Sequence, residues 1–285
     1  MFRRGSSIGK RSFEFTIHES EFGSACLYPK AAKYGRKSIE SFFVSDIHLK
    51  SANERNGEIL LRFLHSIKAK NPKQVQLFLL GDIFDLWVSN GAVFVKKFQA
   101  ISDAIGDLTS SGVRVVFFEG NHDLHIAPHW KNVLNVDVLT EAQTFEIDQM
   151  KVRLEHGDLI NLNDKAYIRL RAVLRHPWVE QLGHWLPGFF WLKVGEAWSP
   201  ASRKKSGHYR ARNEPKLIEM IRHHARRAYE EAPFDLIVTG HMHVKDDFEF
   251  HVGSRKIRSI NLGSWFNGTQ ILRMVDGHLD WMTLD

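Results

Sequence analysis

Three adjacent residues, Asn121, His122 and Asp123, carry side chains that could bind a metal or move a proton. They follow an apolar run at residues 115–118 and a glycine at position 120. Residues of this kind are typical of a buried strand that ends in a tight loop and presents polar groups there. A Gly-Asn pair after a strand is also common in plain turns, so this stretch alone leaves both interpretations open.

Four other apolar runs are followed by the same kind of polar side chain. The residues after these runs are Asp46 and His48, Asp82, His156, and His241 and His243. Each alone has an ordinary structural explanation, because an Asp after a strand often caps a helix and a buried His is often hydrogen-bonded. Ligand sites in open α/β sheets lie at the carboxyl ends of the strands, so the five endings together predict one active site.

Segments with helical periodicity separate most of these runs, which predicts an α/β fold built on βαβ units. The C-terminal part indicates antiparallel strands that complete a second sheet. The predicted order is strand 41–45, helix 59–67, strand 76–80, helix 93–108, strand 115–118, a hairpin over 144–155 turning at 148–149, helix 217–228, strand 236–239 and strands from residue 257.

The candidate ligands are imidazoles, carboxylates and an amide, and the sole cysteine, Cys26, excludes a cysteine-based metal site. Such a donor set suits Mn²⁺, Fe or Zn²⁺. The seven groups exceed what one ion can use, so we expect two divalent ions. Asp82 stands between the Asp46 and Asn121 clusters and is the natural bridging carboxylate. Two bridged ions are typical of hydrolysis at phosphoryl groups.

The order of these motifs resembles the five signature motifs of the calcineurin-like metallophosphoesterases. The resemblance implies a four-layer α/β/β/α sandwich with a helical insertion, and it makes His122 the phosphate-facing catalytic acid. It also implies two sets of metal ligands that share Asp82. The first set is Asp46, His48, Asp82 and His243, and the second is Asp82, Asn121, His156 and His241.

A narrower resemblance covers residues 40–285, to the diphosphatases of lipid A biosynthesis. The resemblance lies in residues 81–87, in residues 156–158 with Asp164 and Tyr167, and in residues 262–265. It implies cleavage of UDP-2,3-diacylglucosamine to UMP and the lipid 1-phosphate, with Mn²⁺, at the cytoplasmic face of the inner membrane. Asp164, Tyr167 and Asn121 would then contact the substrate.

One residue departs from that narrower family, whose members usually carry Arg where this chain has His122. The chemistry is therefore better defined than the substrate, and another phosphodiester or nucleotide diphosphate is the alternative. A metal-free binding protein is a distant third possibility, because all seven candidate ligands are present.

The predicted insertion, residues 163–215, combines positive charge with aromatic side chains. It holds ten Lys or Arg against four Asp or Glu, and four of the eight tryptophans. A stripe that includes Trp185 and Phe189 has helical spacing, which fits either ordinary core or a surface for acyl chains. We expect a helical lid, with Arg203, Lys204 and Lys205 on the substrate's phosphates.

Composition narrows the location and the partners. Residues 1–39 are predicted to be a poorly ordered basic leader, ahead of a metallophosphoesterase domain over 40–285. A net charge of +6 favours anionic partners. The sequence contains no apolar run long enough to span a membrane and no signal-peptide pattern. These features predict a cytoplasmic protein that is peripherally associated with the inner membrane. Its expected partner is a lipid-linked nucleotide diphosphate. The tryptophans of the insertion argue against nucleic acid as a partner. The oligomeric state is left open.

Overall fold

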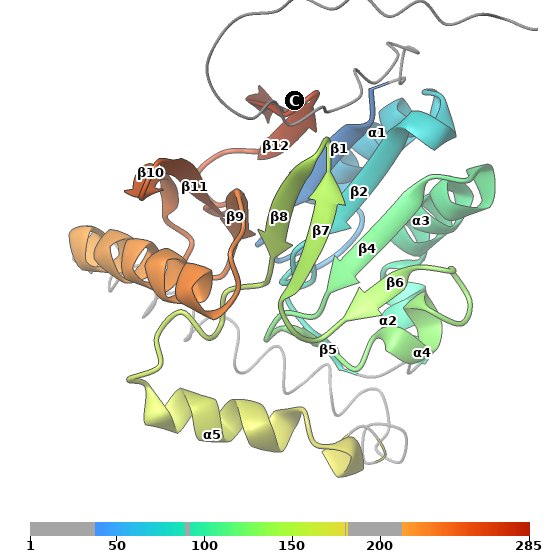
Figure 1. Ribbon diagram of the computed structural model, residues 1–285. Coiled ribbons are helices and arrows are strands. Elements are labelled where there is room, and N and C mark those ends of the chain that lie inside the picture. The colour runs from blue at the N-terminus through green and yellow to red at the C-terminus, as the bar shows by residue number, and fades with distance from the viewer. Residues whose placement is uncertain (1–37, 89–91, 180, 182–212) are drawn as a thin grey trace, which may run out of the picture. The chain divides into compact units, whose positions relative to one another are not determined.

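The computed structural model describes residues 38–88, 92–179, 181 and 213–285 (Figure 1). Its larger sheet has the strand order β13-β12-β1-β2-β4-β6. The four strands from β1 to β6 run parallel, and β12 and β13 join the sheet antiparallel at one side. The bounds are β1 Glu40–Val44, β2 Val75–Leu79, β4 Arg114–Phe118, β6 Asp137–Leu139, β12 Gln270–Val275 and β13 His278–Thr283.

The second sheet has the order β10-β11-β9-β8-β7. Strands β8, β9 and β11 are parallel, and the β7–β8 and β10–β11 hairpins form its two sides. Two short strands, β3 Trp87–Val88 and β5 Asp123–Leu124, pair separately. The bounds in this sheet are β7 Gln143–Ile147, β8 Met150–Leu154, β9 Leu236–Thr239, β10 Lys245–Val252 and β11 Arg255–Leu262.

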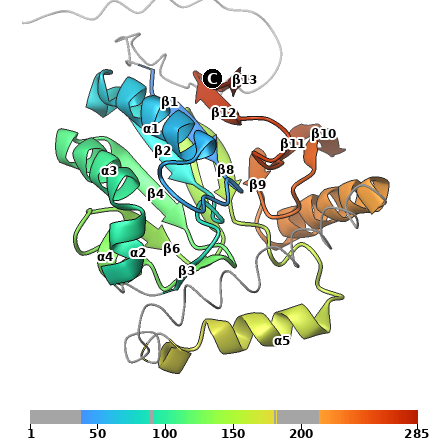
Figure 2. The same ribbon diagram turned by 180° about the vertical axis from the view of Figure 1, so that it is seen from behind.

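Helices cover the outer face of each sheet. On the larger sheet α1 and α3 pack together over β1, β2 and β4, as Figure 2 shows. The helix over residues 213–231 covers the second sheet through Ala225 and Ala228, which contact Ile237 and Ile257. The labelled helices are α1 Arg55–Lys68, the 3-10 turn η1 Pro72–Gln74, α2 Ala92–Lys97, α3 Gln99–Ser111, α4 Ala127–Trp130 and α5 Lys165–Leu174.

The alternation of side chains along β1 explains why the layers stack. Phe42 and Val44 face the helices, whereas Phe43 faces the other sheet and stacks on Phe78 with ring centroids 5.2 Å apart. Both faces of the central parallel strands are therefore buried, which is why these strands read as continuous apolar runs. The predicted α/β/β/α sandwich is confirmed.

Two local predictions had different outcomes. The hairpin turn at Asp148 and Gln149 is confirmed, and both residues have positive φ, as a two-residue turn between twisted strands requires. The single helix predicted over 93–108 is wrong, because the chain forms α2 and α3 with a break at Phe98. The Phe98 ring is fully buried against Phe84 and Trp87, and this packing outweighs helix continuity.

The predicted leader and most of the predicted insertion lie outside the described residues. At the start of the predicted insertion, residues Lys165–Leu174 form α5. The helical lid stays a prediction. Within the part of the chain that the structure describes, no helix is long and apolar enough to cross a membrane.

Candidate metal centre

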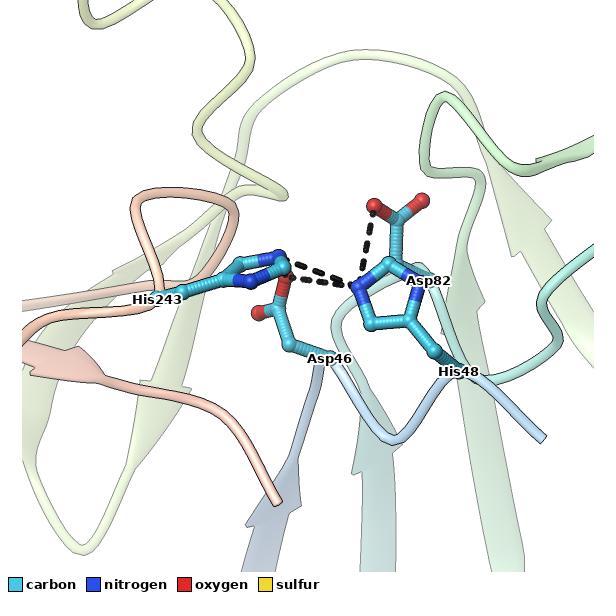
Figure 3. Close-up of side chains that lie close together, drawn as sticks. All are labelled: Asp46, His48, Asp82 and His243. Carbon is cyan, nitrogen blue, oxygen red and sulfur yellow. Dashed lines mark hydrogen bonds and ion pairs between the residues drawn. The ribbon is translucent and has the colours of Figure 1, made fainter. Parts of the chain in front are cut away.

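The loops after five strands bring the predicted ligands together at one edge of the sandwich. Asp46 and His48 follow β1, Asp82 follows β2, Asn121 follows β4, His156 follows β8, and His241 and His243 follow β9. In Figure 3 the side chains of Asp46, His48, Asp82 and His243 point toward one another from three of these loops.

Several of these residues occupy the left-handed backbone region. The φ angles are 52° for Asp46, 54° for His48, 53° for Asp82, 65° for His241 and 54° for His243. This conformation costs an L-residue about 1–2 kcal/mol, and such strain clusters at functional sites. The conformation turns each side chain away from the line of its strand and toward the shared centre.

The first group of possible ligands consists of Asp46, His48, Asp82 and His243. One ligand atom from each lies within 4.8 Å of all the others. The Nε2 atoms of His48 and His243 are 3.0 Å apart, and His243 Nε2 lies 3.0 Å from Asp46 Oδ1. Asp82 Oδ2 is 3.8 Å from His48 Nε2 (Figure 3). Four donor atoms thus surround one small volume.

The second group contains Asp82, His156 and His241, with Asn121 beside them. His156 Nε2 lies 3.2 Å from both Asn121 Oδ1 and His241 Nδ1, and 3.6 Å from Asp82 Oδ2. The two groups therefore share the Asp82 carboxylate. The sequence predicts a bridging ligand at Asp82, and this role stays a prediction.

The protonation states of three of these buried groups fit a divalent cation. Burial lowers the pKa of His48 to about 3, and burial with the neighbouring His156 lowers the pKa of His241 to about 4, so both imidazoles are neutral and offer lone pairs. Burial alone would raise the pKa of Asp82, but the imidazoles of His156 and His122 lower it. Ionised carboxylates and neutral imidazoles are what such a cation binds.

Asp46 shows the same fit through an unsatisfied atom. Its Oδ1 is fully buried and forms no aligned hydrogen bond among the described residues, although it lies 3.0 Å from His243 Nε2. A buried carboxylate oxygen without a donor is costly unless a cation completes its surroundings. Its other oxygen, Oδ2, accepts the backbone N–H of His241 at 2.9 Å.

Backbone groups hold the remaining ligand atoms in place. Asp82 Oδ1 accepts the N–H groups of Asn121 and His122, both at 2.9 Å, and His156 Nδ1 donates to the carbonyl of Leu80 at 2.8 Å. Such outer contacts fix ligand orientation. Two glycines permit them, because a Cβ at Gly120 would lie 2.2 Å from Asp82 Oδ1 and one at Gly240 would lie 2.4 Å from Asp46 Oδ2.

His122 lies beside the first group rather than within it. Its ring is 4.8 Å from that of His48, and its Nδ1 is 2.8 Å from the carbonyl oxygen of Asp85. A carbonyl can only accept, so Nδ1 carries the proton of that hydrogen bond. Burial opposes protonation of the ring, but Asp82 raises the pKa of His122. His122 is thus placed as a donor at the edge of the centre.

Sequence reasoning assigned no specific role to two residues that support the centre. Asp85 holds His122, and Asp123 accepts backbone N–H groups from Asp82, Ile83 and Gly120 at 3.0, 2.7 and 2.8 Å. Asp123 belonged to the opening triplet, and its full burial could not be read from the sequence.

The residues that were predicted to contact the substrate lie in different places. Tyr167 lies near the centre, with its ring 5.9 Å from that of His241 and its hydroxyl donating to Asp158 Oδ2 at 3.0 Å. Asp164 is exposed, and its side chain accepts the N–H of Tyr167, which caps α5. Arg203, Lys204 and Lys205 lie outside the described residues.

The insertion's first helix is joined to the centre by two arginines. Arg171 Nε donates to Asp158 Oδ2 at 2.6 Å. Arg175 Nη2 donates to the carbonyls of Glu119 and Gly120 at 2.9 and 3.2 Å, directly before Asn121. These contacts place α5 beside the second ligand group.

A sandwich whose strand ends gather such a set of His, Asp and Asn is the mark of a metallophosphoesterase. Residues 41–245 match the model of the calcineurin-like phosphoesterase family, and the chain belongs to that family. It is a metal-dependent hydrolase.

Curated relatives give a narrower likeness. The UDP-2,3-diacylglucosamine hydrolase of Histophilus somni (strain 2336) is 23% identical over 235 residues, which are 82% of this chain and 96% of the relative. The enzyme of the same name from Haemophilus influenzae (strain PittGG) is 26% identical over 82% of this chain and 94% of its own. Among solved structures, the crystal structure of a predicted phosphoesterase from Streptococcus pneumoniae TIGR4 is 15% identical, with a TM-score of 0.38. The match covers 87% of this chain and 91% of the other.

Proposed function

We propose that this protein hydrolyses the diphosphate of UDP-2,3-diacylglucosamine and releases UMP and 2,3-diacylglucosamine 1-phosphate. The observation that carries the reaction type is the Asp82 carboxylate, which is common to two groups of possible ligands. The names of the relatives supply the substrate. The proposal places this chain in lipid A biosynthesis.

The proposed centre holds two divalent cations, with Mn²⁺ as the first choice and Fe or Zn²⁺ as alternatives. Asp46, His48 and His243 would hold one, Asn121, His156 and His241 the other, and Asp82 both. Bound there, the ions would polarise the phosphoryl group and supply an activated water.

The chain's own residues would orient the substrate and stabilise developing charge. His122 keeps Nδ1 on the Asp85 carbonyl, so Nε2 is the ring nitrogen left for the substrate. Protonated, it would donate a hydrogen bond to a non-bridging phosphoryl oxygen, where negative charge grows in the transition state. Asn121 would contact both metal and substrate.

The insertion over 163–215 would bind the lipid half of the substrate. Arg171 and Arg175 fix α5 at the centre, and Leu170, Val173 and Trp178 on and after α5 are 41, 50 and 50% exposed. Exposed apolar groups beside cations suit a lipid headgroup at a membrane surface. Tyr167, Asp164, Arg203, Lys204 and Lys205 are the proposed contacts, and the protein would work at the cytoplasmic face of the inner membrane.

One assay tests this function. The purified chain is incubated with Mn²⁺ and UDP-2,3-diacylglucosamine in detergent, and UMP is measured by chromatography. UMP should appear, and both EDTA and Asp82→Asn should prevent its release. Absence of UMP under all metal conditions contradicts the substrate.

His122 favours a second candidate, because the broader family has His at this position and the narrower one usually has Arg. That candidate is a phosphodiesterase with another substrate. Hydrolysis of bis-p-nitrophenyl phosphate, without any UMP from the lipid substrate, would support it.

A further inference from the structure

A cavity of about 330 Å³ opens beside His48. Besides Ile47, it is lined by His48, Lys50, Glu54, Arg55, Asn56 and Phe266. Its volume lies at the lower end of the roughly 300–1,000 Å³ typical of small-ligand sites. None of these residues except His48 has a part in the centre described above.

Phe266 gives the cavity an aromatic wall. Its ring stacks on His48 with centroids 5.2 Å apart and planes 11° from parallel, yet the residue is 44% exposed. The neighbouring Trp265 fixes this loop. Its backbone N–H donates to the carbonyl of Asp46 at 3.2 Å, and its indole N–H donates to the carbonyl of Gln270 at 3.1 Å. An exposed ring held next to a metal ligand is a ready stacking surface.

The polar side chains that line the cavity together with Phe266 match the edge of a pyrimidine base. A uracil ring offers two carbonyl acceptors and one N–H donor. Asn56 can donate and accept, Glu54 can accept, and Lys50 and Arg55 can donate. Glu54 is already positioned, because its Oε1 accepts the backbone N–H of Lys50 at 3.0 Å.

We infer that this cavity binds the nucleoside of the substrate, with its base stacked on Phe266. The inference rests on the proposed function and extends it. Tyr167 and α5 stand at the His241 side of the centre, and Phe266 stands at the His48 side. The diphosphate then lies across the two ligand groups, with the lipid half toward α5 and the nucleoside half toward Phe266.

The test is calorimetric titration of the Mn²⁺-loaded full chain with UMP and, separately, with ribose 5-phosphate, which has the phosphate but no base. Phe266→Ala and Phe266→Leu should weaken UMP binding about 10-fold, the effect of one lost stack, and change ribose 5-phosphate binding less than about 2-fold. Phe266→Tyr should restore UMP binding. Val133→Ala, an exposed apolar residue outside the cavity, is the matched control.

Unchanged UMP binding in Phe266→Ala overturns the inference. An equal loss of binding for UMP and for ribose 5-phosphate also overturns it, since the ring would then act through His48 and the metals. In that case the metal content of the variant would be measured by mass spectrometry. These titrations need no lipid. Failure of the proposed function would appear separately, as absence of UMP release from UDP-2,3-diacylglucosamine by the unaltered chain.

Discussion

The buried carboxylate of Asp123 accepts the backbone N–H of Asp82 at 3.0 Å. The same side chain accepts the N–H groups of Ile83 and Gly120, so it joins the loop after β2 to the loop after β4. The proposed bridging ligand therefore depends on a residue that lies outside both groups of possible ligands.

Replacing Asp123 by Ala should lower the free energy of unfolding by about 3–5 kcal/mol, because several buried amides lose their acceptor. Urea unfolding with and without Mn²⁺ measures this loss. Asp123→Asn keeps one carbonyl acceptor and should have an intermediate effect. An alanine variant as stable as the parent would show that these hydrogen bonds make no net contribution to the free energy of unfolding.

Asp82→Ala should abolish turnover and lower the metal content of both sites, because the two ligand groups share this carboxylate. Losing such a charge should reduce the rate by at least about 10³-fold. Metal analysis by mass spectrometry decides the point. The control is Asp107→Ala, which removes an exposed carboxylate paired with Lys68. A variant that retained two equivalents of metal would exclude Asp82 as the bridge.

His122→Arg should keep appreciable diphosphatase activity, whereas His122→Ala should lose most of it. Both variants should retain two metals, because His122 lies beside the ligand groups. The reason is that a charged donor can stabilise phosphoryl charge whether it is imidazolium or guanidinium. Steady-state kinetics on good and poor leaving groups separates this role from general acid catalysis, which contributes about 10²- to 10⁴-fold mainly for poor ones.

Full activity in His122→Ala, or loss of metal from either variant, would refute the role assigned to His122. It would also reopen the choice of substrate, since the narrower family usually carries Arg there.

Replacing Trp185, Phe189 and Phe190 by Ser should raise KM for a diacylated substrate and leave a small chromogenic phosphodiester almost unaffected. Only the acylated substrate uses apolar binding surface. These residues lie outside the described part of the chain, so kinetics on the two substrates is the measurement. Equal losses on both would indicate that the three side chains belong to a structural core.

Stability at acid pH should depend on Asp235, which precedes β9. Burial opposes its ionisation, but the N–H of Lys151 at 2.8 Å and the guanidinium of Arg255 at 2.7 Å lower its pKa below the ordinary value of 3.8. A depressed folded-state pKa stabilises the fold above the unfolded value, and this contribution is lost as pH falls through the folded value.

Asp235→Asn should therefore cost about 1 kcal/mol at pH 7. The difference from the parent should shrink below about pH 4. Denaturant unfolding in EDTA at pH 7, 5 and 3 measures it. A difference that stayed constant across this range would show that the carboxylate's charge is not involved.

The layers of the fold were predictable because both faces of the central strands are buried. Phe42, Phe43 and Val44 form an unbroken apolar run that signals a covered parallel strand. The break at Phe98 was not predictable, because the periodicity on its two sides is continuous and only the packing of its ring against Phe84 interrupts the helix.

The candidate ligands were predictable because each follows an apolar run directly, and strand ends meet at one edge of a sheet. Asp85 and Phe266 were not. Asp85 contacts His122 through its backbone carbonyl, which leaves no trace in residue type. Phe266 lies in a loop, and the sequence of a loop does not indicate which cavity an aromatic side chain will line.

The hydrogen bond from His241 to Asp46 joins residues 195 positions apart in the chain. Closing so long a loop is entropically expensive, so the centre can assemble only after both sheets have paired. During synthesis the first three ligand loops leave the ribosome long before His241 and His243 exist. Cation binding at the complete centre would then come late in folding, and it would stabilise a nearly complete fold by mass action.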